Sequence, residues 1–214
     1  MNKHVIARQN MSGEKIIMTH NSQRLFEIVS DIFHPITNAG IAFFLLTMFA
    51  GSNDIAMKTI YFVIALSFSM IIPFLYIFSL KRKGHLETVD ITERMQRLNP
   101  FAFSILSYFI GFFVLRFSGA PLSVQGLMFC YGSNTLLVML VTRWWKVSVH
   151  TTGIAGPLVA LTFGFGSVIY LFYPLIVLVG LSRVVLKRHT VMQVLVGGVL
   201  GLSLTALQFA MFFS

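Results

Sequence analysis

Two basic segments of the chain each place a histidine within a few residues of a serine and a cation. A neutral imidazole can attack phosphorus, and a second imidazole can protonate the leaving oxygen. Lysine and arginine can bind the phosphate oxygens and stabilise the charge of the transition state. The two segments therefore predict phosphoryl transfer without a metal. They contain Lys146, Ser148 and His150, and Ser182, Arg183 and His189.

Each segment taken singly has an ordinary structural interpretation. A lone histidine at a membrane interface is more often a hydrogen-bonded anchor than a catalyst, and a basic loop more often follows the positive-inside bias than binds a substrate. The combination favours a site, because both segments fall on the same predicted side of the membrane. The other four histidines have no matching partners in the sequence and receive no role: His4, His20, His34 and His85.

The carboxylates stop early in the chain, because no aspartate or glutamate follows Glu93. Unpaired cations at membrane depth are costly. We therefore expect an anionic group to bind some of the lysine and arginine residues that follow Glu93. A magnesium site needs carboxylates, and this half of the chain has none to offer. The sequence therefore predicts no metal and no cofactor.

The composition describes a membrane protein. Of 214 residues, 56% are hydrophobic and 11% are charged, and the mean hydropathy is +0.81. These values exclude a soluble enzyme, a disordered tail and a secreted disulfide scaffold. The net charge of +9 does not indicate nucleic-acid binding, because the basic residues are scattered between apolar runs. The single cysteine, Cys130, is expected to be a small buried apolar residue.

The apolar runs predict an all-α fold, a polytopic transmembrane helix bundle. Spanning the hydrocarbon takes about 20 helical residues. Residues 1–31 form a polar N-terminal tail, and 32–214 form a single transmembrane domain with six or seven spans. The fifth and sixth spans depend on a tight turn at residues 164–166. The candidate spans are 32–51, 57–80, 100–117, 121–142, 149–165, 167–184 and 189–213.

The distribution of cations predicts the orientation. With seven spans, the loops 81–99, 143–149 and 182–189 share one side with the N-terminal tail. Of the 16 lysine and arginine residues, Lys58 and Arg116 alone fall on the other side. The positive-inside bias makes the basic side cytoplasmic. If residues 152–180 form one helix instead, the last basic loop crosses the bilayer and this argument weakens.

The polar segment 81–100 predicts a short helix at the interface. Asp90 and Glu93 have the spacing of a capping box, and Arg94 and Arg97 recur with Asp90 on one stripe. Asn99-Pro100 is expected to end this helix. The alternative is a cytosolic connector whose arginines touch lipid headgroups. On the last span, Gly197, Gly198 and Gly201 predict close helix packing.

These segments together resemble the type 2 phosphatidic acid phosphatase superfamily, whose pattern is Lys-x6-Arg-Pro, Pro-Ser-Gly-His and Ser-Arg-x5-His-x3-Asp. The third element is matched by Ser182, Arg183 and His189, with Gln193 where the family has aspartate. In the second element, valines replace the proline and the glycine around Ser148 and His150. Residues 90–100 resemble the Asp-x3-Arg-x2-Arg variant of a divergent branch. The resemblance runs from about residue 81 to residue 201.

The resemblance implies a role for each matched residue. His189 would be the nucleophile that forms a phosphohistidine, and His150 would be the acid for the leaving group. Gln193 lies one helical turn after His189, so its amide oxygen can accept from one imidazole nitrogen and leave the other free. Asp90 could supply the missing negative charge. The implied phosphate-binding residues are Arg183, Arg97 and Lys146, helped by Ser148 and Ser182, with Arg94 as a further candidate.

The resemblance implies an integral membrane phosphatase acting on a lipid monophosphate or diphosphate, of the prenyl diphosphate or phosphatidic acid type. The lipid tail would enter laterally between helices, and the site would face the cytoplasm in an inner or plasma membrane. A phosphotransferase would use the same residues. A non-enzymatic binder or transporter of anionic lipids is the other hypothesis. The expected partners are the lipid substrate and membrane lipids, without nucleic acid, and the oligomeric state stays open.

Overall fold

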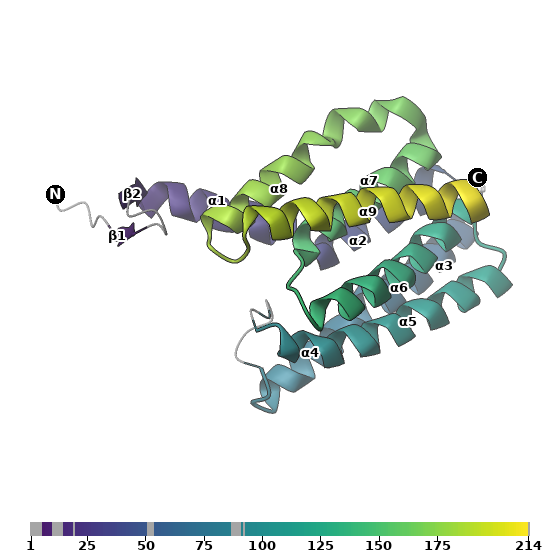
Figure 1. The fold of residues 1–214 in the computed structure, drawn as a ribbon. Helices are drawn as coiled ribbons and strands as arrows, with labels where there is room; N and C mark the ends of the chain where they lie inside the picture. Colours follow the sequence, from purple (N-terminus) through teal and green to yellow (C-terminus); the bar gives the residue numbers. More distant parts are fainter. Residues whose placement is uncertain are drawn as a thin grey trace.

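The computed structural model describes residues 6–9, 15–18, 20–50, 54–86, 91 and 93–213. Two short strands, β1 (Ile6–Gln9) and β2 (Lys15–Met18), pair antiparallel near the N-terminus. From residue 20 onward the described chain forms helices and their connections (Figure 1). The α-helices are α1 (His20–Ile32), α2 (Pro35–Phe49), α3 (Ile55–Leu66), α4 (Ile72–Arg82), α5 (Leu98–Phe117), α6 (Leu122–Thr142), α7 (Val149–Phe165), α8 (Pro174–Val185) and α9 (Val191–Phe212). A π-helix, η1 (Ser67–Ile71), joins α3 to α4, and two 3-10 helices, η2 (Met95–Arg97) and η3 (Gly166–Phe172), precede α5 and α8.

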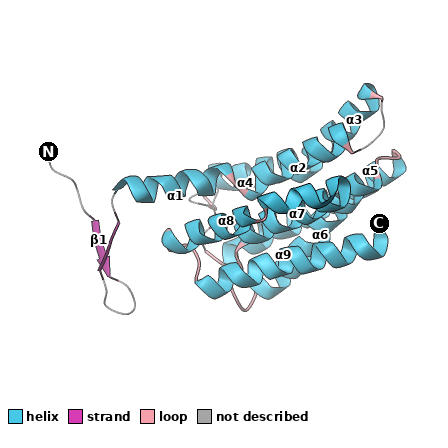
Figure 2. Ribbon diagram, turned by 90° about the horizontal axis from the view of Figure 1, so that it is seen from above, coloured by secondary structure: helices cyan, strands magenta, loops and turns pink. Residues whose placement is uncertain are grey.

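The helices are long and apolar enough for a multi-pass membrane protein, as the composition predicts. Five segments qualify by length and hydropathy, or six if the bent pair α1–α2 counts as one span. The bend of 45° falls between Ile32 and Pro35. In Figure 2, α1 and α2 follow one another along one edge of the bundle. The five segments are Ile55–Arg82, Met95–Phe117, Leu122–Thr142, Val149–Phe172 and Val191–Phe212.

The segment after α7 folds back along the bundle. Helix α7 ends at Phe165, and Gly166 adopts a φ of +78°, which a residue without Cβ reaches at little cost. The predicted break at residues 164–166 is therefore present. The returning arm differs from the predicted helix 167–184, because it begins as the 3-10 helix η3 and becomes α-helical at Pro174. Proline suits a first helical turn, where its missing N–H is not needed.

The prediction that Asn99-Pro100 ends a short helix is wrong. The 3-10 turn η2 runs directly into α5, which begins at Leu98 and continues through Pro100 to Phe117. Pro100 lies in the first turn of α5, where a missing N–H breaks no helical hydrogen bond. Asp90, the proposed cap, lies outside the described residues. Arg97 is thus placed where a membrane-length helix begins.

The polar tail predicted for residues 1–31 includes most of a helix. Helix α1 begins at His20, and Ser30 near its end is buried against α8. The hydroxyl of Ser30 accepts a hydrogen bond of 2.6 Å from Nη1 of Arg183. The N-terminal segment therefore contributes directly to the basic end of the bundle.

Glycines bring α9 into contact with α7, as the small-residue face predicts. The hydroxyl of Thr152 donates to the carbonyl of Gly197 over 2.9 Å. A Cβ atom at Gly197 would lie 2.6 Å from the carbonyl oxygen of Ser148, and one at Gly201 would lie 2.8 Å from the carbonyl oxygen of Thr152. This close approach holds the N-terminal ends of α7 and α9 together.

We expect Gly197→Ala to destabilise the protein. The added methyl group would overlap the backbone of Ser148, and overpacking of this kind costs about 1–3 kcal/mol. The matched control is Gly198→Ala, whose new Cβ would meet Ile176 at 3.6 Å, an ordinary contact distance. Thermal unfolding in detergent measures both variants. Equal midpoints for the two would contradict the packing described here.

Candidate active site

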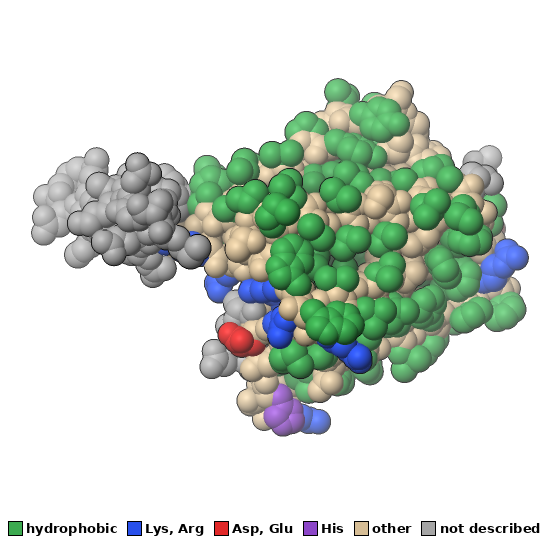
Figure 3. Space-filling model, in the orientation of Figure 1, with side chains coloured by type: hydrophobic (Ala, Val, Ile, Leu, Met, Phe, Trp, Pro, Cys, Tyr) green, Lys and Arg blue, Asp and Glu red, His purple; other side chains and the backbone are tan. Residues whose placement is uncertain are grey.

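The basic end of the bundle gathers the three connections singled out in the sequence. Figures 1 and 2 place the ends of α4, α6 and α8 and the starts of α5, α7 and α9 at the same end of the molecule. In Figure 3, most of the visible lysine and arginine side chains lie at this end, and hydrophobic side chains cover most of the rest of the visible face. A cluster of cations therefore meets the edge of an apolar surface.

The loop between α8 and α9 turns His189 back over the end of α8. The carbonyl oxygen of Arg183 accepts from the backbone N–H groups of Arg188 at 3.0 Å and His189 at 3.2 Å. Lys187 adopts a φ of 55°, and its N–H donates to Val184. These bonds form the 6→1 and 5→2 pattern of a Schellman cap, with lysine where glycine is usual. The cap fixes the backbone of His189 beside Arg183.

Helix α9 fixes the tautomer of His189. The amide oxygen Oε1 of Gln193 accepts from the backbone N–H of Thr190 at 3.2 Å, and Nδ1 of His189 lies 3.1 Å from the same oxygen. The hydroxyl of Thr190 in turn accepts from the N–H of Gln193, which completes a capping box. Because a backbone N–H must donate, Oε1 is an acceptor and Nδ1 carries the proton. The lone pair of His189 is then on Nε2.

The surroundings of His189 keep its ring neutral. The side chain is buried, and this burial is the largest cause that lowers the pKa of His189 from 6.5 to about 3. The next causes are the positive charges of Arg97, Lys146 and Arg183. The hydrogen bond to Gln193 acts in the opposite direction. Three cations, from η2, from the connection between α6 and α7 and from the last turn of α8, therefore act on one neutral imidazole.

We expect the ring of His189 to stay neutral down to about pH 4. Its pKa of about 3 in the folded protein lies below the value near 6.5 of an unfolded imidazole. The unfolded state therefore binds more protons between these values, and the stability contributed by His189 is present at neutral pH and is lost as the pH falls through this window. NMR titration of ring-labelled histidine, assigned with His189→Gln, measures the pKa. A midpoint near 6.5 would contradict the burial and charge described here.

The connection between α6 and α7 joins the same site through its backbone. The N–H of Ser148 donates to the carbonyl of Gln193 over 3.1 Å, and Nζ of Lys146 donates to the carbonyl of Arg188 over 3.0 Å. The hydroxyl of Ser148 caps α7 by accepting from the N–H of Thr151. His150 is buried in the first turn of this helix. The two histidine segments, which are far apart in sequence, are thus hydrogen-bonded to each other.

Arg97 and Arg183 are buried at this end, at 5% and 2% exposure. Nε of Arg97 donates to the carbonyl of Ile91 at 2.7 Å, and its Nη1 reaches the carbonyl of Val147 at 3.5 Å. Arg183 is held by Ser30. Nε of Arg97 and Nη1 of Arg183 thus donate hydrogen bonds to neutral oxygens.

His34 and Ser30 belong to this site, although sequence reasoning gave them no role. The rings of His34 and His150 meet edge to face with centroids 5.2 Å apart. Nδ1 of His34 accepts from the N–H of Ile36 at the start of α2, which places its own proton on Nε2. The pair His34-Pro35 signals a helix start in the sequence, but the contact with His150 depends on tertiary packing.

Two predicted site residues, Arg94 and Ser182, have no described side-chain hydrogen bond to the other residues of this cluster. Asp90 lies outside the described residues. Arg94 is half-buried, and its backbone carbonyl accepts from the N–H of Arg97 over 3.2 Å. The hydroxyl of Ser182 donates to the carbonyl of Val179 in its own helix, although the side chain is fully buried.

The arrangement of side chains in this cluster suits the binding of an anion. Within the described ranges, no group of three histidine, cysteine or carboxylate side chains lies close enough to hold a metal ion. Comparison with family models, with curated proteins and with solved structures finds no match for this chain. Buried arginines beside a neutral imidazole with a defined tautomer can bind a phosphate group and attack it.

Proposed function

We propose that this protein is an integral membrane lipid phosphatase that forms a phosphohistidine at His189 without a metal. The observation that carries the proposal is the environment of His189: a buried neutral ring, its Nδ1 bound to Gln193, acted on by three cations. The substrate is a lipid monophosphate or diphosphate. The resemblance of residues 81–201 to the type 2 phosphatidic acid phosphatase superfamily agrees with this chemistry, and we propose membership of a divergent branch with a similar helical core.

In the first step, Nε2 of His189 attacks phosphorus. A bond forms between Nε2 and phosphorus, the bond to the leaving oxygen breaks, and His150 in its protonated form gives that oxygen a proton. Arg97, Arg183 and Lys146 offset the negative charge of the phosphoryl oxygens as it shifts during transfer. His34, against the ring of His150, helps to position the acid.

In the second step, water hydrolyses the phosphohistidine. The neutral His150 accepts a proton from the water while the new oxygen–phosphorus bond forms and the nitrogen–phosphorus bond breaks. This restores neutral His189 and protonated His150 and releases inorganic phosphate. An alcohol in place of water would make the protein a phosphotransferase with the same residues.

The proposed orientation places the N-terminus and the site in the cytoplasm of an inner or plasma membrane. With α1–α2 as one bent span and η3–α8 as the return from α7, the chain crosses seven times. The basic loops then lie on one side, in agreement with the positive-inside bias. Single-cysteine labelling near Lys83 in a Cys130→Ser background tests this side.

Phosphate release in the presence of EDTA tests the enzymatic proposal. Detergent-solubilised protein should release inorganic phosphate from a lipid phosphate at the same rate with EDTA as with magnesium. His189→Ala is the inactive control. Release that depends on added magnesium would contradict the mechanism.

One observation favours the second candidate, a non-enzymatic binder of anionic lipids. Gln193 is a neutral amide, and it stabilises a positive charge on His189 less than a carboxylate would. A binder would keep the cation cluster and bind lipid phosphate without releasing inorganic phosphate.

We expect Gln193→Glu to raise both the pKa of His189 and the turnover number. Glutamate has the length of glutamine and keeps the capping box, so its carboxylate would occupy the place of the amide oxygen and stabilise the positive charge that develops on the ring. The expected gain is about tenfold. Gln193→Asp introduces the residue that the family has at this position, and a gain there as well would show that the charge, rather than the length of the side chain, limits turnover. Steady-state kinetics measure both, and no gain with Glu would show that charge at this position does not limit turnover.

A further inference from the structure

The connections α6–α7 and α8–α9 carry cations and tryptophans on their outer surface, outside the buried cluster. The three cations are exposed, and the two tryptophans are 76% and 37% exposed. Neither connection contains a carboxylate. We call this group of side chains the loop patch: Arg143, Trp144, Trp145, Lys187 and Arg188.

A side-chain hydrogen bond joins the two halves of the loop patch. Nζ of Lys146, the residue after the tryptophans, donates to the carbonyl of Arg188 over 3.0 Å. The N–H groups of Trp144 and Trp145 both donate to the carbonyl of Val141 in the last turn of α6, which fixes the start of this connection. The two connections therefore form one surface, although they are far apart in sequence.

Lys187 occupies a backbone position that suits glycine. Its φ of 55° lies in the left-handed region, where a Cβ atom comes too close to the following carbonyl oxygen. Among the described residues, it is the only one other than glycine with a positive φ. Glycine would complete the same Schellman cap without strain. A strained residue at such a position indicates a use for its side chain.

Apolar side chains border the loop patch. Leu181 in α8 and Val191 and Met192 at the start of α9 are exposed. In Figure 3, the lysine and arginine side chains at this end meet a surface covered mostly by hydrophobic side chains. Tryptophan favours the headgroup level of a bilayer, and cations at that level attract anionic headgroups. The loop patch therefore has the chemistry of a surface that contacts lipid headgroups.

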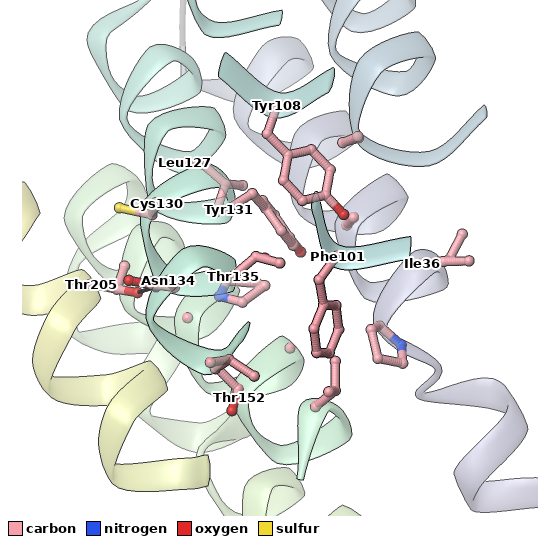
Figure 4. Close-up of a pocket in the computed structure, with 18 residues that line it drawn as sticks. Ile36, Phe101, Tyr108, Leu127, Cys130, Tyr131, Asn134, Thr135, Thr152 and Thr205 are labelled. Carbon is pink, nitrogen blue, oxygen red and sulfur yellow. Dashed lines mark hydrogen bonds between the residues drawn. The ribbon is translucent and has the colours of Figure 1, made fainter. Parts of the chain in front are cut away.

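The cavity inside the bundle has a different character. Figure 4 shows the rings of Phe101, Tyr108 and Tyr131 at this cavity, which encloses about 650 Å³ between α2, α5, α6 and α7. None of the described residues in its wall carries a charge. An anionic headgroup would lose its hydration there without meeting a cation. The headgroups of bilayer phospholipids are therefore expected at the surface of the basic end rather than in this cavity.

We propose that the loop patch binds the headgroups of anionic bilayer phospholipids through their phosphate groups, at a site separate from the buried cluster around His189. Lys187 and Arg188 bind the phosphate, and the tryptophans lie against the glycerol region beside it. The apolar side chains of α8 and α9 contact the acyl chains, so the occupant is a lipid rather than free phosphate. This inference does not depend on the proposed phosphatase activity.

Tryptophan fluorescence tests the loop patch directly, because the chain has 2 tryptophans and both belong to the patch. Full-length protein is placed in phosphatidylcholine nanodiscs with a minor fraction of brominated phosphatidylglycerol or brominated phosphatidylcholine. We expect the anionic lipid to quench about twofold more strongly. Lys187→Gly and Arg188→Gln should each remove at least about half of this excess. Because glycine suits the φ of Lys187, Lys187→Gly should keep or raise the midpoint of thermal unfolding.

Lys83→Gln is the matched control, because Lys83 is exposed at the end of α4 and its loss lowers the net charge as much as Arg188→Gln does. The excess quenching should remain in this variant. Equal quenching by the two lipids, or an excess that neither patch variant lowers, would overturn the proposal. An equal loss in Lys83→Gln would overturn it in favour of attraction by net charge. An excess abolished by inorganic phosphate, but not by sodium chloride of equal ionic strength, would show a free-phosphate site instead of a lipid site.

Discussion

Replacement of His189 by glutamine is expected to lower phosphate release by about 10⁴-fold or more, as removal of a nucleophile does in other enzymes. Glutamine is polar and similar in length, so it can occupy the buried position between Arg183 and α9 without an apolar mismatch. It has no lone pair able to form a stable bond to phosphorus. Lipid phosphate should still bind, because the three cations remain.

The matched control for this change is His85→Gln. His85 is an exposed histidine near the end of α4, and its replacement should leave activity intact. Thermal unfolding of both variants separates loss of chemistry from loss of fold. If His189→Gln kept more than about a tenth of the wild-type rate, another residue would have to be the nucleophile.

Replacement of Arg183 by lysine is expected to lower kcat/KM by about 100-fold. Lysine keeps the charge but loses the planar guanidinium, which can bind two phosphate oxygens while Nη1 bonds Ser30. The backbone carbonyl that fixes Arg188 and His189 is unchanged by the substitution. The loss should therefore reflect phosphate binding and transition-state charge rather than a displaced loop.

Arg82→Lys is the control for Arg183→Lys. Arg82 is exposed at the same end of the bundle and lies over the ring of Phe78, so its charge is near the site but outside it. We expect little change in steady-state kinetics. Equal losses for Arg82→Lys and Arg183→Lys would indicate general attraction of anionic lipid by the basic surface instead of a defined phosphate site.

The sequence was most informative where the chemistry is local. The spacing of His189 and Gln193 predicts a hydrogen bond across one helical turn, and that bond is present. The glycines at 197 and 201 predict close packing, and the backbone of α7 lies against them. The glycine at 166 marks the end of α7, as the turn signal indicates.

The predictions from the sequence were wrong or incomplete where tertiary packing determines the structure. The sequence predicts that Pro100 ends a helix, but proline is also tolerated in the first turn of a helix, and α5 continues beyond it to Phe117. Ser30 and His34 lie far from the other site residues in sequence, so only the packing of α1 and α2 brings them to Arg183 and His150. Neither sits in a local pattern that predicts these partners.

The phosphohistidine itself tests the central claim most directly. Wild-type protein is mixed with phosphatidic acid labelled with ³²P, quenched at alkaline pH where phosphohistidine survives, and digested for mapping. We expect label on the peptide that contains His189. This label should be absent from His189→Gln and should be chased by unlabelled substrate. Continued release of phosphate without label on that peptide, or label that persists in His189→Gln, would contradict it.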